Sequence, residues 1–146
     1  MDTRKVIKVG VDADTIKSGF ALINGSHYEI TTLTFFEMFK RFKELITHYG
    51  TEKIIVYVEC GFLNKSNWHK KIGQSASVNA KIGERTGANF EVAKKICEMC
   101  EYLGLEYVQI KPTRSKVNAE TFKAITGITK RTNQEERDSF LLVWGR

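Results

Sequence analysis

The sequence predicts an α/β domain in which helices cover both faces of a mixed, five-stranded β-sheet. The first three strand patterns follow one another through short turns, which is typical of antiparallel strands. The last two strand patterns are each reached through a helical pattern, which favours parallel pairing. With 146 residues the chain has the length of one domain, so we expect a single domain over residues 1–146.

Three short strands account for the N-terminal part of the chain. Residues 5–12 are rich in Val and Ile and end on Asp12, which predicts the first strand. Residues 19–23 and 27–34 predict the second and third strands, and the NGS stretch between them is a strong hairpin signal.

A helix and a buried strand follow. Apolar residues at helical spacing predict a helix over residues 35–48, ended by Gly50. Residues 54–59 form a nearly continuous apolar run that ends on Glu59, which predicts a strand covered on both faces.

The C-terminal half is predicted to be mainly helical. A long helix is expected over residues 73–103 with a break around residues 83–87, followed by a strand over residues 105–110. A short helix is expected over residues 118–125 with Asn118 as its N-cap, and Thr132 or Asn133 caps the last helix.

The composition indicates the class of partner and of compartment. A net charge of +6 favours a polyanionic partner, because Lys and Arg that neutralise phosphates release condensed counterions. No apolar run approaches the length of about 20 residues that spans a bilayer, and the N-terminus has no signal-peptide pattern. We therefore expect a cytoplasmic protein.

The CxxC formed by Cys97 and Cys100 invites a zinc or redox interpretation. It lies within a helical pattern, and neither a second CxxC nor a His pair at finger spacing accompanies it. Packing in a core or at an interface is therefore favoured, and this helix could also supply a dimer interface.

Four acidic residues are candidates for a metal centre. Asp12 and Glu59 end two strands and would lie side by side if these strands were adjacent and parallel. Glu135 and Asp138 are three apart and share a helix face. Each acid alone has an ordinary interpretation, such as a turn residue or a partner of the helix dipole. Together they predict a site for Mg²⁺ or Mn²⁺, which prefer oxygen ligands, and two such ions could support phosphodiester hydrolysis.

Basic residues that could contact a nucleic acid follow Glu59 and precede the last helix. A solvated surface is the ordinary interpretation of such residues, and Trp68 could instead be a buried anchor. We expect contact with phosphates and bases from Lys65, Trp68, Lys70, Lys71, Arg114, Lys116, Lys123, Lys130 and Arg131.

Several segments resemble the motifs of RuvC-type Holliday-junction resolvases, which belong to the RNase H-like superfamily. VGVDADTIKSGFALI resembles the first motif and IIVYVECGF the second, a strand that ends in the catalytic Glu. KIGERTGANFEVAKKICEMCEYLGLEYVQIKPTRSK resembles the segment that follows, and NQEERDSFLLVWG resembles the last motif, with two acids opening the final helix.

The resemblance implies an RNase H-like fold with Asp12, Glu59, Glu135 and Asp138 as the catalytic carboxylates. It further implies two Mg²⁺ or Mn²⁺ ions per active site, a homodimer, and paired nicks in branched DNA. Lys116 and Lys130 are the candidates for a lysine near the scissile phosphate.

The chain departs from the family pattern at three points. Asp12-Ala13-Asp14 replaces Asp-Pro-Gly, so that Asp14 could approach the metals, although a turn role is the simpler interpretation. Glu135 replaces the commoner Asp, and the short stretch before it is closer to compact phage or poxvirus-type relatives. These differences bear on substrate preference more than on chemistry.

The sequence leaves other functions as alternatives. An RNase H-like nuclease could instead act on an RNA–DNA hybrid or a flap, and a non-catalytic nucleic-acid-binding module could keep the same fold. The related actin-like and sugar-kinase ATPases are disfavoured, because they need two such domains and a second glycine-rich phosphate motif.

Overall fold

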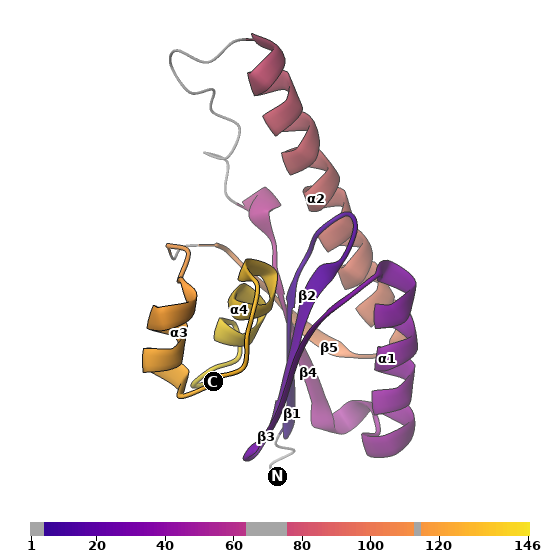
Figure 1. Ribbon diagram of the computed structural model, residues 1–146. Helices are drawn as coiled ribbons and strands as arrows, with labels where there is room; N and C mark the ends of the chain where they lie inside the picture. The colour runs from indigo at the N-terminus through magenta and orange to yellow at the C-terminus, as the bar shows by residue number, and fades with distance from the viewer. Residues whose placement is uncertain (1–4, 64–75, 113–114) are drawn as a thin grey trace.

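The computed structural model describes residues 5–63, 76–112 and 115–146 (Figure 1). The strands are β1 (Ile7–Asp12), β2 (Ser18–Asn24), β3 (His27–Leu33), β4 (Ile54–Glu59) and β5 (Glu106–Ile110). The helices are α1 (Phe35–Tyr49), α2 (Ala76–Leu103), α3 (Ala119–Thr126) and α4 (Gln134–Leu141), and short 3₁₀ turns at Thr51–Lys53 and Gly61–Leu63 flank β4. The predicted order of elements is confirmed.

The strands form one mixed sheet in the order β3-β2-β1-β4-β5. β2 pairs antiparallel with both β1 and β3, whereas β4 runs parallel to β1 and β5 parallel to β4. This arrangement fits an RNase H-like α/β fold. The register pairs Asp12 of β1 directly with Glu59 of β4, so the two acids expected at adjacent strand ends are neighbours.

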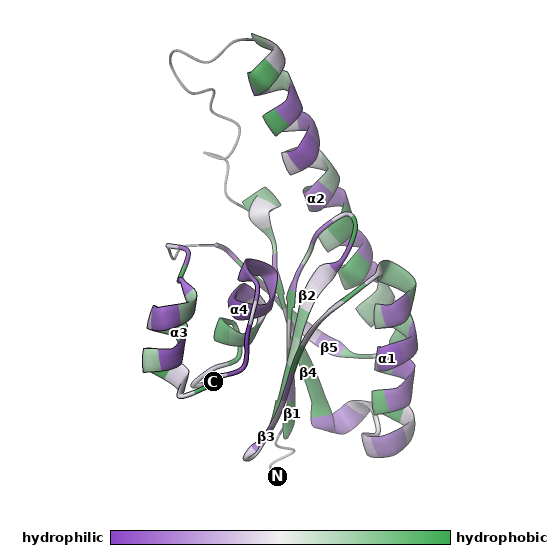
Figure 2. Cartoon of the chain, viewed as in Figure 1, coloured by the Kyte–Doolittle hydropathy of each residue, from purple (hydrophilic) through white to green (hydrophobic). Residues whose placement is uncertain are grey.

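Helices cover both faces of the sheet, as predicted: α1 and α2 lie on one face and α3 and α4 on the other (Figure 1). β1 and β4 are hydrophobic over most of their length, whereas the helices also carry many hydrophilic residues (Figure 2). Side chains alternate along a strand. Val9 and Val11 therefore pack in the core beneath α1 and α2, while Gly10 and Asp12 face α4.

Two glycines allow α4 to lie directly on the backbone of the sheet. A Cβ atom on Gly10 would be 2.1 Å from the carbonyl oxygen of Ser139, and one on Gly19 would be 2.0 Å from that of Glu135. No side chain fits in so small a space. The close approach brings the start of α4 next to the amino end of β2. Asp12 lies there, because the carboxyl end of β1 pairs with this part of β2.

The expected break in α2 around residues 83–87 is wrong, because the helix is continuous from Ala76 to Leu103. A glycine inside a helix costs only about 1 kcal/mol relative to alanine. The buried residues of α2 begin at Phe90, and the part before it projects beyond the sheet (Figure 1). Cys97 and Cys100 are buried free thiols that pack toward the sheet, which confirms core packing for the CxxC.

The predicted helix caps are also confirmed. The Asn118 side chain accepts a hydrogen bond from the backbone N–H of Thr121, and Gly127 ends α3 in the left-handed conformation. Asn133 caps α4 and forms a reciprocal capping box with Glu136. Across the residues described, none of the helices has the length and apolar character needed to span a bilayer.

Candidate active site

Asp12 and Glu59 form an acidic pair at the carboxyl ends of β1 and β4. The two side chains share a hydrogen bond. Burial is the largest cause that raises the pKa of Asp12 from 3.8 to about 8; the negative charges of Glu59 and Asp138 contribute to this rise, and Lys116 opposes it. Without a cation, Asp12 therefore holds a proton at neutral pH.

The acidic pair lines a cleft of about 260 Å³. Helix α2 forms part of its lining, and the segment that follows β5 forms another part. The lining residues are Asp12, Ala13, Glu59, Gly61, Thr86, Asn89, Phe90, Ala93, Pro112 and Lys116. The cleft thus combines acids from the sheet with a lysine and with an amide from α2.

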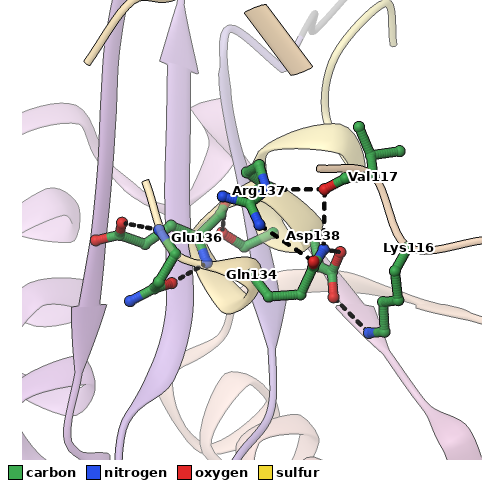
Figure 3. Close-up of polar contacts among 8 residues, drawn as sticks. Lys116, Val117, Gln134, Glu136, Arg137 and Asp138 are labelled. Carbon is green, nitrogen blue, oxygen red and sulfur yellow. Dashed lines mark hydrogen bonds and ion pairs between the residues drawn. The ribbon is translucent and has the colours of Figure 1, made fainter. Parts of the chain in front are cut away.

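Asp138 is the third acid of the site and enters it from α4. Its side chain is only 8% exposed and accepts hydrogen bonds from one cationic and one polar side chain (Figure 3). Lys116 Nζ donates to Oδ2 at 2.5 Å, and Gln134 Nε2 donates to Oδ1 at 2.8 Å. Partial burial lowers the pKa of Lys116, but the hydrogen bond and the charge of Asp138 outweigh that effect, so the pKa is raised above 10.5.

A hydrogen-bonded clamp fixes the Lys116 segment against α4 (Figure 3). Arg137 Nε donates to the carbonyl of Val117 at 2.8 Å and Arg137 Nη1 to that of Thr132 at 2.7 Å, while Gln134 Nε2 also donates to Val117 at 3.3 Å. The sequence analysis missed Gln134 and Arg137 as positioning residues. Gln134 and Arg137 are close to Asp138 in the sequence of α4. The sequence does not reveal, however, that the distant backbone at Val117 packs against these two side chains.

Glu135, the fourth predicted acid, is partly buried at the start of α4, where its backbone carbonyl lies against Gly19. Among the described residues, the Asp138 carboxylate is bonded to Lys116 and Gln134 and not to Glu135. In the part of the chain that the structure describes, no three His, Cys, Asp or Glu side chains are arranged so as to hold a metal ion. The role of Glu135 therefore stays a prediction.

The two candidate lysines lie in different places. Lys116 lines the acidic cleft, whereas Lys130 Nζ donates to the carbonyl of Ile30 on the edge strand β3 at 2.7 Å. Lys116 is thus beside the acidic pair and Lys130 on the edge strand, and a role of either lysine at a phosphate stays a prediction.

The remaining residues predicted to contact nucleic acid fall into two groups. Lys123, Lys130 and Arg131 are exposed. Lys65, Trp68, Lys70, Lys71 and Arg114 lie outside the described residues. Asp14 takes the expected turn role, since its carboxylate accepts a hydrogen bond from the Ile16 N–H at 3.1 Å.

The donor set in the cleft fits a hard divalent cation. Asp12 and Glu59 are oxygen donors whose mutual repulsion is relieved by a proton in the metal-free protein, and a cation between them would relieve it instead. Asp138 is already neutralised by Lys116, so it could join a metal only if this ion pair opened.

Comparison with protein-family models finds no match, and comparison with curated proteins finds no significant one. Among solved structures, the chain is similar to RuvC from Thermus thermophilus in complex with a Holliday junction substrate: identity is 14%, the TM-score is 0.49, and the match covers 92% of this chain and 87% of that one. A second Thermus thermophilus RuvC structure matches at 13% identity with a TM-score of 0.44, covering 94% of this chain and 90% of that one.

Proposed function

We propose that this chain is a metal-dependent endonuclease that cleaves phosphodiester bonds in branched DNA, as a RuvC-like Holliday-junction resolvase does. The observation that carries the proposal is the direct pairing of Asp12 with Glu59 at the ends of parallel strands, with Asp138 and Lys116 beside them. The resemblance of the sequence motifs and the net charge of +6 support the same function.

Each residue of the site has a distinct role in this proposal. Asp12 and Glu59 hold one Mg²⁺ or Mn²⁺ ion, and Glu135 with Asp138 completes a site for a second. Ions bound there would polarise the phosphodiester and favour ionisation of the attacking water. Lys116 donates to a non-bridging oxygen of the scissile phosphate, for which its ammonium must leave Asp138.

The protein around the site positions these groups. The clamp made by Gln134 and Arg137 holds the segment that bears Lys116. The ammonium group is therefore kept close to the cleft. The exposed cations Lys123, Lys130 and Arg131, together with Lys65, Trp68, Lys70, Lys71 and Arg114, bind the DNA backbone and bases. A homodimer would supply the two active sites needed for paired nicks in a two-fold symmetric junction.

The test is cleavage of a labelled four-way junction beside linear duplex, a flap and an RNA–DNA hybrid, each with Mg²⁺, with Mn²⁺ and with EDTA. We expect metal-dependent, paired nicks in the junction. Cleavage of the hybrid alone would move the function to RNase H, and absence of cleavage with retained binding would indicate a non-catalytic module.

A further inference from the structure

The side-chain oxygen of Asn89, Oδ1, has no role in the proposed function described above. Asn89 lies on α2 and lines the same cleft as Asp12 and Glu59. Its Oδ1 atom is shut off from solvent and has no hydrogen-bond partner among the residues that the structure describes; no other described side chain has such an atom. The amide oxygen is therefore the one unsatisfied buried side-chain acceptor in the described structure, and it belongs to a residue that lines the cleft of the acidic pair.

The surrounding packing keeps Asn89 at this place. Thr86, Asn89 and Ala93 recur at helical spacing and form the wall of the cleft. The next residue, Phe90, is only 8% exposed and meets Phe62 edge to face with ring centroids 6.3 Å apart. This part of α2 is thus anchored in the core, and Asn89 cannot easily move away from the cleft.

An unsatisfied buried acceptor costs about 1–3 kcal/mol, so a functional occupant is expected. A phosphate oxygen cannot satisfy it, because both groups are acceptors. A hard cation can, since side-chain amide oxygens are ordinary ligands of such ions, and the two carboxylates that line the same cleft attract a cation to it. Because χ2 of Asn is a soft torsion, the amide can turn toward the ion at little cost.

We propose that Asn89 supplies a neutral oxygen ligand to the divalent cation held by Asp12 and Glu59. The inference rests on the metal site of the proposed function and adds to it a ligand from α2, the helix that covers the opposite face of the sheet from α4. A neutral ligand completes the coordination of the ion without adding a third negative charge to an already repulsive pair.

The test is Mn²⁺ binding to the full chain, measured by isothermal titration calorimetry. Asn89→Leu should weaken binding at least about tenfold, in line with the loss of a ligand or its support. Its unfolding temperature without metal should be equal to or above that of the wild type, because an unsatisfied buried acceptor has been removed. Asn89→Asp, which keeps an oxygen at this position, should bind at least as tightly as the wild type.

Asn24→Leu is the matched control. Asn24 is also partly buried, but it lies at the other end of β2 and donates to Tyr49. It should leave Mn²⁺ affinity unchanged. Wild-type affinity in Asn89→Leu, or equal weakening in Asn89→Leu and Asn89→Asp, would overturn the assignment of Asn89 while leaving the metal site intact. If Asp12→Asn binds as tightly as the wild type, or if the wild type does not bind, both the metal site and the ligand role of Asn89 are refuted.

Discussion

Replacement of Asp12 by Asn should stabilise the metal-free protein at alkaline pH. Burial beside Glu59 raises the pKa of Asp12 from 3.8 to about 8. Between these values the folded protein holds a proton that the unfolded chain has released. The free energy of unfolding of the wild type therefore falls as the pH rises from about 4 to about 8 and stays low above that range. The Asn side chain of Asp12→Asn has no proton to release and stays neutral, so the variant escapes this decrease.

The size of the effect follows from the two pKa values. At about 1.4 kcal/mol for each tenfold change in proton affinity, the difference sets a ceiling of roughly 6 kcal/mol. Water in the cleft and the nearby ammonium of Lys116 screen the buried charge, so we expect about 2–3 kcal/mol at pH 9 and under about 1 kcal/mol at pH 5.

The assay is urea unfolding of the full chain in EDTA at both pH values. Asp14→Asn is the control, because it makes the same charge change two residues away, in a turn outside the acidic pair. The reasoning is refuted if Asp12→Asn is no more stable than the wild type at pH 9, or if Asp14→Asn gains equal stability.

Two further substitutions test the packing of α4 and the role of the lysine. Gly10→Ala should destabilise the fold by about 3 kcal/mol or more in urea unfolding, because the added Cβ would lie 2.1 Å from the Ser139 carbonyl oxygen. Gly83→Ala, where the new Cβ meets nothing within 4 Å, should be neutral or stabilising by up to about 1 kcal/mol, and an equal loss in both variants would contradict this account. Lys116→Met should lower the rate of junction cleavage at least about 100-fold. The free energy of unfolding should change by only about 1 kcal/mol, because the Lys116 side chain is 68% exposed and Asp138 keeps Gln134 as a second partner. A cleavage rate within threefold of the wild type would exclude Lys116 from the chemistry.

Local patterns were sufficient to predict the order of the elements and the central pair of acids, although not the continuity of α2. The apolar run of β4 and the Val-rich β1 each end on an acid, and strands that arrive through helices pair in parallel. Asp12 and Glu59 could therefore be placed side by side without coordinates. The caps at Asn118 and Asn133 were predictable for the same reason, because a capping side chain satisfies backbone groups within its own turn.

Features that depend on contacts between distant segments could not be predicted in this way. Gly10 looks like an ordinary strand residue until α4 is packed on it, and only then does its missing side chain matter. Lys116 and Lys130 are equivalent in sequence, but one reaches Asp138 and the other an edge-strand carbonyl. Asn89 is one polar residue among many on a long helix, and only the cleft distinguishes it.

The central claim is that the carboxylates beside Asp12 cleave branched DNA with a divalent cation. Its most direct test is single-turnover cleavage of a four-way junction in Mg²⁺ by the wild type, Asp12→Asn and Asp14→Asn, with junction binding measured in parallel. We predict that all three bind the junction, that the wild type and Asp14→Asn cleave it, and that Asp12→Asn is slower by at least about 1,000-fold. Undiminished cleavage by Asp12→Asn would contradict the account.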